Sequence, residues 1–171
     1  MIKYVTFLFM TASQALAADP GIGSYAKYIY KSQEGNGTPP SIGVQIDSIV
    51  GLNPSGPNYQ LKTEVLVLGR VNTTSLWNLS GNYFRNTEYF IDHCTQSNGN
   101  IENLKVAAGK FSTCHILFNQ PDQATISQEV WLNNEVPMFK VKQIRISNDA
   151  NKTRVSLELQ DFKFALGPVQ K

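Results

Sequence analysis

Residues 59–68 read YQLKTEVLVL, a run in which apolar and polar side chains alternate. One parity carries mostly apolar or β-branched side chains, namely Tyr59, Leu61, Thr63, Val65 and Val67. The other parity starts polar and becomes apolar at Leu66 and Leu68. Successive side chains of a β-strand point to opposite faces of a sheet, so a period of two predicts a strand with one buried face. The second face of this strand is expected to be exposed to solvent at one end only.

A second alternating run lies near the end of the chain, at residues 155–164. Its apolar side chains share one parity up to Leu159 and take the other parity from Phe162 onward. A β-bulge near Asp161 would account for this change, because one extra residue reverses the faces of the residues that follow.

Clusters of Gly, Pro, Asn and Ser separate such runs roughly every eight to fifteen residues, as in residues 34–40 and 51–58. Short helix-like spacings occur at residues 25–31 and 76–84, but β-branched, aromatic or turn-forming neighbours interrupt them, and both are interpreted as strands. The expected fold is all-β, with at most one or two short helices. About eight or nine strands would form an antiparallel meander that curls on itself.

The first residues have the pattern of an export signal. Lys3 is the only early charge, residues 4–10 are mostly apolar, and Ala15 and Ala17 are small residues at the −3 and −1 positions of a cleavage site. The apolar run is too short to span about 30 Å of hydrocarbon. We expect a signal peptide at 1–17 and a single β domain at 18–171. An uncleaved membrane anchor is the disfavoured alternative.

No cysteine follows the apolar run where a lipoprotein signal would place its acylated residue. No other stretch is apolar for long enough to span a bilayer, so a soluble mature protein is expected in the periplasm or outside the cell. The formal net charge is +2, and the Lys and Arg residues are scattered. Nucleic acid is not an expected partner, because a phosphate-binding surface needs clustered cations.

The only cysteines are Cys94 and Cys114, and we predict one disulfide between them. It would close a loop of about twenty residues and contribute about 3 kcal/mol in the chain-entropy model. His93 and His115 stand on the outer sides of the cysteines, so a zinc site is the alternative. Oxidation would remove its thiolates, and neighbours in a strand point to opposite faces. No metal or other cofactor is therefore expected.

The same two histidines would face each other if the cysteines lie opposite one another in antiparallel strands. Such a pair could form a pH-sensitive contact, since both rings titrate near neutrality. Two half-exposed polar residues flanking a disulfide are the favoured interpretation.

Signatures of catalysis are missing from the chain. It contains no glycine-framed serine elbow, no phosphate-cradling glycine loop and no His-Glu-x-x-His motif. Dispersed carboxylates could meet in space as in glycoside hydrolases, but no local motif selects a pair. A non-enzymatic protein is expected, and a hydrolase with dispersed carboxylates is the weakest of three hypotheses.

The features between residues 104 and 165 come in a recognisable order. They are the run VAAGKF at 106–111, the strand residues EVWL at 129–132, the turn EVP at 135–137 and the run LEL at 157–159. This last third of the chain resembles uncharacterised exported bacterial proteins related to the lipoprotein-localisation carriers, the LolA/LolB-like group. The chain departs from that pattern at Ala107, where proline is usual, and after Pro137, where no glycine follows.

The resemblance implies a single antiparallel curved sheet that forms a half-open barrel around a short helix or plug. It also implies an apolar concavity for acyl chains or for an apolar partner segment. Aromatic residues occur in nearly every predicted strand. Each one is expected to fill the core rather than to line a ligand site, but the set as a whole could leave a lined cleft.

The leading hypothesis is an exported binding or carrier module that holds an apolar ligand on the concave face of its sheet. The ligand would be a small apolar molecule, or an acyl chain of a lipid or lipoprotein, or a hydrophobic segment. The residues expected to pack against it are Trp77, Trp131, Met138 and Phe139. The second hypothesis is a structural or interaction protein of a cell-envelope assembly, with an envelope protein as partner and no internal ligand.

Overall fold

The structure is a computed structural model that describes residues 20–35, 37–53, 58–118 and 125–165. The expected signal peptide, residues 1–17, lies outside the described residues. Among those that are described, no helix is long and apolar enough to cross a membrane.

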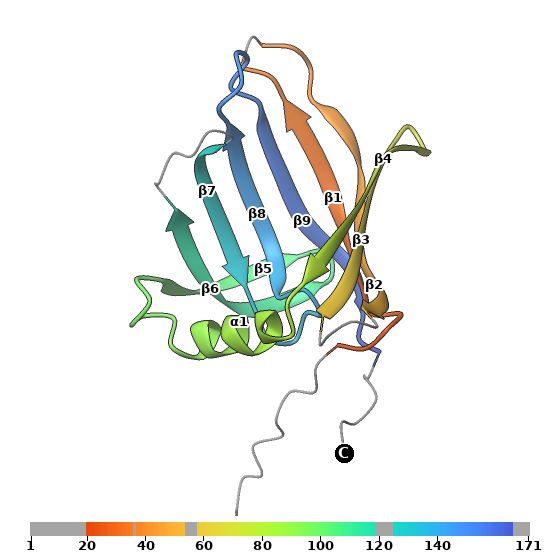
Figure 1. Ribbon diagram of the computed structural model, residues 1–171. Coiled ribbons are helices and arrows are strands. Elements are labelled where there is room, and N and C mark those ends of the chain that lie inside the picture. Colours follow the sequence, from red (N-terminus) through yellow and green to blue (C-terminus); the bar gives the residue numbers. More distant parts are fainter. Residues whose placement is uncertain (1–19, 36, 54–57, 119–124, 166–171) are drawn as a thin grey trace, which may run out of the picture.

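Nine strands and one helix make up the described chain (Figure 1). In chain order they are β1 (Tyr25–Gln33), β2 (Ser41–Asn53), β3 (Asn58–Val67), β4 (Arg70–Leu79), α1 (Asn82–Asp92), β5 (Asn100–Val106), β6 (Gly109–Phe118), β7 (Thr125–Leu132), β8 (Lys140–Ser147) and β9 (Arg154–Lys163). All nine strands belong to one sheet with the order β4-β3-β2-β1-β9-β8-β7-β6-β5, and each neighbouring pair is antiparallel. The all-β prediction is confirmed.

The sheet curves strongly without closing, because β4 and β5 lie at its two opposite edges. The chain passes from one edge to the other through α1, which lies across the lower end of the curved sheet in Figure 1. The first and last strands, β1 and β9, pair with each other in the middle of the sheet. The result is the half-open barrel with a short helix that the sequence predicts.

The bulge predicted near Asp161 is confirmed. Lys27 of β1 lies opposite Asp161, whereas the next residue, Tyr28, lies opposite Leu159, so Gln160 has no partner across the strand pair. The extra residue restores the inward direction of the apolar side chains that follow it. Phe162 accordingly packs against the core.

The prediction of a strand over residues 76–84 is wrong for the second part of this segment. Strand β4 ends at Leu79, and α1 begins at Asn82. The helical pattern becomes visible only when the window continues past residue 84, because Phe84, Thr87 and Ile91 then recur at the spacing of one helix face.

The main core lies on the inner, concave face of the sheet and is covered at one end by α1. Phe84 is the one buried residue of the helix, and its ring meets Tyr59 edge-on with 4.7 Å between the ring centroids. Residues from most of the strands complete this core, including Tyr28, Ile49, Phe111, Val141, Leu157 and Leu159. Complete burial of one such apolar side chain stabilises the fold by about 1.5–3 kcal/mol.

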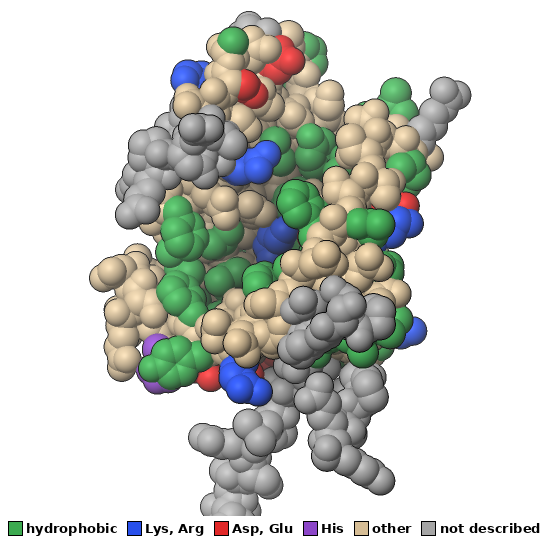
Figure 2. Space-filling model, viewed as in Figure 1, with side chains coloured by type: hydrophobic (Ala, Val, Ile, Leu, Met, Phe, Trp, Pro, Cys, Tyr) green, Lys and Arg blue, Asp and Glu red, His purple; other side chains and the backbone are tan. Residues whose placement is uncertain are grey.

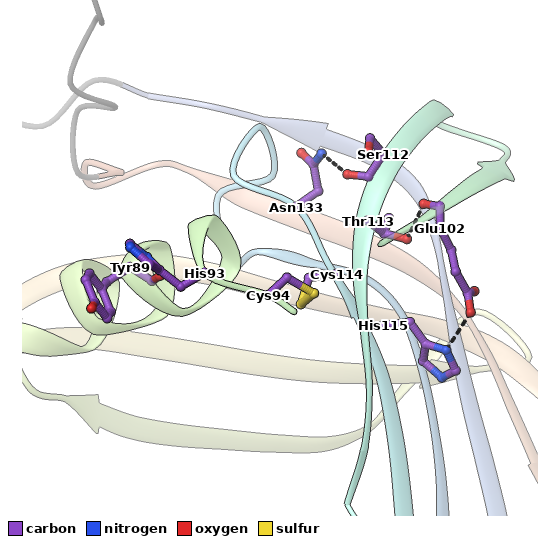
Figure 3. Close-up of a disulfide and its surroundings, with 9 residues drawn as sticks. All are labelled: Tyr89, His93, Cys94, Glu102, Ser112, Thr113, Cys114, His115 and Asn133. Atoms are coloured by element: carbon purple, nitrogen blue, oxygen red, sulfur yellow. Dashed lines mark hydrogen bonds and ion pairs between the residues drawn. A yellow bond between two sulfur atoms is a disulfide. The ribbon is translucent and has the colours of Figure 1, made fainter. Parts of the chain in front are cut away.

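A disulfide between Cys94 and Cys114 ties the segment after α1 to β6, as predicted (Figure 3). Gly99 packs against it, and a Cβ at that position would stand 2.6 Å from the Cys94 sulfur, so only glycine fits without a shift. The bond supports an extracytoplasmic location, because disulfides persist in oxidising compartments.

The condition under which His93 and His115 would face each other is not met, because Cys94 lies beyond the end of a helix and not in a strand. The ring of His93 stacks on Tyr89 of α1, with 4.1 Å between centroids. His115 lies opposite Asn100 and Trp131 in the sheet. The two histidines therefore point to different parts of the molecule (Figure 3).

Candidate functional site

A pocket of about 630 Å³ opens between α1 and the inner face of β6, β7 and β8. Its lining residues are Ser80, Tyr83, Asn86, Thr87, Phe90, Ile116, Phe118, Gln128, Val130, Leu132, Met138, Lys140 and Gln143. Figure 2 shows the molecule hollowed on the face seen there, with hydrophobic side chains gathered around the hollow. The volume lies within the range of about 300–1,000 Å³ that is common for small-molecule sites.

One wall of the pocket is apolar and comes from the strand register. Ile116 lies opposite Val130, and both are buried in one cluster with the disulfide. Leu132 lies two residues further along β7 on the same face. Phe90 of α1 packs against this cluster from the helix side. A sheet face and a helix face thus enclose one apolar space.

Among the described residues that line the pocket, Lys140 is the only charged one. Its Nζ lies 3.3 Å from Oδ2 of Asp47. The other oxygen of this carboxylate, Oδ1, accepts hydrogen bonds of 2.9 Å from Thr63 and from Gln45. An ionised group can be buried only with such partners, so the cluster explains how Asp47 sits inside an apolar core.

Tyr28 lies beside this ion pair on β1. The Nζ of Lys140 stands 5.0 Å from the centroid of its ring. The side chain is fully buried, and its hydroxyl has no hydrogen-bond partner among the described atoms. Burial raises the pKa of Tyr28 well above its usual value, and the negative charge of Asp47 raises it further. The phenol therefore stays protonated at physiological pH.

Of the four predicted site residues, Met138 is the one that lines the pocket. The neighbouring Phe139 packs behind it against the rings of Phe84 and Tyr83. The backbone φ of Phe139 is 59°, a left-handed conformation that bulky residues rarely adopt. This is the turn after Pro137 where the LolA/LolB-like pattern has a glycine, which adopts such a φ without strain.

Trp131 lies on the outer, convex face. Its ring stacks on His115 with 4.2 Å between centroids and 4° between planes, and its Nε1 donates a 3.0 Å hydrogen bond to Oε2 of Glu102. Nζ of Lys142, a residue of β8, stands 4.8 Å from the centroid of the Trp131 ring. Hydrogen bonds from Trp131 and from His115 (Figure 3) lower the pKa of Glu102. The structure thus separates Trp131 from the pocket by the thickness of the sheet.

Trp77 lies on β4, the edge strand. It stands opposite Leu61, which in turn stands opposite the buried Ile49, so the three share the inner face. Even so, 57% of Trp77 is exposed, because β4 is an edge strand of the sheet that the described residues form. Trp77 is not among the lining residues of the pocket. Trp77 therefore lies on the inner side of the sheet edge that β4 forms.

Lys140 and Asp47 are the site residues that the sequence analysis missed. Asp47 occupies an inward position within the largely apolar run VQIDSIV at 44–50, and a charge at such a position is the signal that could have revealed it. Lys140 begins β8, where the register shifts between its pairing with Leu132 and the pairing of Lys142 with Trp131. A shift of this kind cannot be read from the sequence of one strand.

No protein-family model matches this chain, and neither does any curated protein sequence. Solved structures do match. A crystal structure from Bacteroides fragilis of a protein thought to be exported, with a YmcC-like fold, gives a TM-score of 0.51 at 9% identity and covers 85% of this chain and 98% of that one. That score shows a shared fold over far more than residues 104–165, so the likeness is not confined to the last third.

Two further structures match with lower scores. A LolA superfamily protein from Nitrosomonas europaea gives a TM-score of 0.33 at 6% identity, covering 89% of this chain and 90% of that chain. A β-barrel-like protein of a domain of unknown function from Brucella abortus gives 0.32 at 8% identity, covering 85% and 99%. At such scores and identities these two likenesses carry no fold, ligand or activity to this chain.

Proposed function

We propose that this protein is a non-enzymatic binding or carrier module that holds an apolar ligand on the concave face of its curved sheet. The observation that carries the proposal is the pocket of about 630 Å³ between α1 and β6 to β8, with its wall of Ile116, Val130 and Leu132. Apolar surface removed from water stabilises a complex by about 25 cal/mol per Å². The ligand is an acyl chain or another apolar group that such a wall can cover.

The predicted site residues take different parts in this proposal. Met138 contacts the ligand in the pocket, and Phe139 supports Met138 from behind. Trp77, on the inner side of the open edge, meets the part of a ligand that extends beyond the pocket. Trp131 fixes β6 to β7 from the outer face and has no ligand contact.

Adjacent residues of β6 provide a matched test. Phe118 lines the pocket and is 47% exposed, and Leu117 is 50% exposed and points to the other face. Phe118→Ser should weaken the binding of a fluorescent fatty-acid analogue about tenfold, because an apolar contact is lost. Leu117→Ser should leave the dissociation constant unchanged. If both variants changed the dissociation constant equally, the ligand would not bind in this pocket.

Native mass spectrometry of protein purified from its own envelope fraction, followed by organic extraction, tests for a natural ligand. We expect a stoichiometric acyl-chain compound. A protein that is empty and that also fails to take up the fluorescent analogue would refute the carrier function.

A structural role in an envelope assembly is the second candidate, and the edge strand β4 favours it. Val71 and Leu76 of this strand are more than half exposed, as is Leu68 in the preceding turn. An unpaired strand edge with exposed apolar side chains can add a strand from another protein. Under this alternative, Leu76→Lys would abolish co-purification of an envelope partner and leave the binding of the fatty-acid analogue intact.

A further inference from the structure

We propose that the pocket selects amphiphiles with an anionic head group over neutral or cationic ones of the same chain, and that Lys140 is the residue that selects them. The inference rests on the proposed function and adds the chemical class of the ligand. Of the lining residues that the structure describes, Lys140 is the single charged one, and the others are apolar or neutral polar.

The ion pair with Asp47 exposes its cation to the pocket and hides its anion. Asp47 keeps 5% of its side-chain surface exposed, against 20% for Lys140. Asp47 is not among the lining residues, whereas Lys140 is. A ligand in the pocket therefore meets a positive charge first.

The partners of Asp47 hold that positive charge in place. Thr63 and Gln45 both donate to Oδ1, which leaves Oδ2 to face Nζ of Lys140. An ammonium group has three N–H donors. Within the described part of the chain, Asp47 is the one side-chain acceptor to which Nζ donates, and the ring of Tyr28 covers another side. The ammonium can donate to a ligand oxygen without releasing Asp47.

Tyr28 also borders the ion pair, with its ring centroid 5.0 Å from Nζ of Lys140. Its side chain is fully buried and does not line the pocket, so selection of the head group is assigned to Lys140 and not to the phenol.

The register also gives the ligand a direction. Lys140 lies opposite Leu132, and Leu132 lies opposite Cys114, at one end of the pocket wall. Phe118 lies at the other end of the wall, four residues after Cys114 in β6, and four residues of an extended strand span roughly 13 Å. A single chain would run from the head group at Lys140 across Ile116 and Val130 to Phe118.

Competition against the fluorescent fatty-acid analogue tests the selection. The competitors share one chain length and differ in the head: a fatty acid, its methyl ester, an alkyl phosphate and an alkylammonium. We expect the wild-type protein to bind the acid about tenfold more tightly than the ester, because a hydrogen bond to an ionised group is about twice as strong as a neutral one. The ammonium compound should bind most weakly. The ratio of acid to phosphate distinguishes a carboxylate site from a phosphate site.

Lys140→Gln should reduce the preference for acid over ester to about one, and Lys140→Arg should retain it. Lys142→Gln is the matched control, since it removes the same charge two residues away on the outer face. Lys140→Gln leaves Asp47 buried without its cation and can fail to fold. The double variant Asp47→Asn with Lys140→Gln removes the pair together and should fold while still losing the preference.

Each result decides a different question. Equal binding of acid and ester by the wild type would overturn the head-group selection and leave the carrier function standing. Failure of every competitor and of the analogue to bind would overturn the carrier function itself. A loss of preference in Lys142→Gln that matches the loss in the double variant would overturn the assignment to Lys140.

Discussion

Val130 and Trp131 are neighbours in β7, yet they lie in two different environments on the two faces of one sheet. Val130 is 7% exposed and Trp131 is 6% exposed, so burial does not distinguish them. Val130 belongs to the apolar wall of the pocket. Trp131 is covered on the outer face by a stacked imidazole, a carboxylate and an ammonium group.

The difference shows what each face is built to do. The inner face relies on apolar contacts, which are non-directional and can be shared between a core and a ligand. The outer cluster relies on a hydrogen bond and ring stacking, which have fixed geometry and leave no space for a ligand. A large aromatic residue in a strand therefore indicates a ligand site only when its face is known. The following predictions test this contrast.

The largest effect is expected from Phe84→Ala in the helix that covers the inner face. Phe84 is 1% exposed and contacts the rings of Tyr59, Tyr83 and Phe139. Its loss should lower the free energy of unfolding by about 3–5 kcal/mol, measured by urea denaturation. Tyr89→Ala, at a helix position that is 65% exposed, is the control and should cost about 0.5 kcal/mol or less. Similar losses in both variants would mean that α1 does not pack through Phe84.

Removal of the disulfide should have the next largest effect. Replacing both Cys94 and Cys114 by serine should lower the free energy of unfolding by about 2–4 kcal/mol, because the lost bond joins positions that are 20 residues apart. The same variant should bind the fatty-acid analogue more weakly, because the bond ties the end of α1 to the pocket wall. Unchanged denaturation of the wild type under reducing conditions would contradict this expectation.

Trp131→Phe tests the outer face. It removes the hydrogen bond to Glu102 and should cost about 1 kcal/mol of stability. Because this hydrogen bond is the largest cause of the lowered pKa of Glu102, that pKa should rise, as an NMR titration would detect. His115→Phe should raise it as well, since the hydrogen bond from His115 and the charge of its ring both lower this pKa. Affinity for the fatty-acid analogue should not change, and a tenfold loss would place Trp131 on the ligand side.

The smallest effect concerns Tyr28 and alkaline pH. Tyrosine ionises near pH 10 in an unfolded chain, whereas Tyr28 in the folded protein keeps its proton to a higher pH. Above about pH 10 the unfolded state therefore binds fewer protons, and the free energy of unfolding falls as pH rises. In Tyr28→Phe this fall should be shallower, while stability below about pH 9 should change little because the hydroxyl has no partner to lose. If the free energy of unfolding fell equally with pH in the two proteins, the pKa of Tyr28 would not be raised by folding.

Much of the fold follows from local signals in the sequence. Alternation at residues 59–68 predicts β3, the change of parity near Asp161 predicts the bulge in β9, and an even cysteine count predicts the bond between Cys94 and Cys114. These features depend on a few neighbouring residues or on simple counting, so one sequence is sufficient to find them.

The candidate site is harder to predict because it depends on long-range register. Asp47 and Lys140 meet only because β2, β1, β9 and β8 are adjacent in the sheet, and no local pattern gives that order. Met138 lines the pocket and Trp131 lies on the outer face, which depends on the register of β6 and β7, and ligand contact by the four proposed residues stays a prediction. The helix α1, which supplies four of the described lining residues, is hard to predict because its apolar spacing begins inside a stretch that also has the features of a strand.

The pairing of β1 with β9 has a consequence for the order in which the sheet can form. The two strands are adjacent in the sheet, yet Tyr25 pairs with Lys163, which lies far along the chain. During synthesis β1 therefore has one open edge until β9 has been made. Contacts so distant in sequence make folding slow. An open strand edge can pair with another chain, so β1 is the expected site of aggregation in the partly made protein.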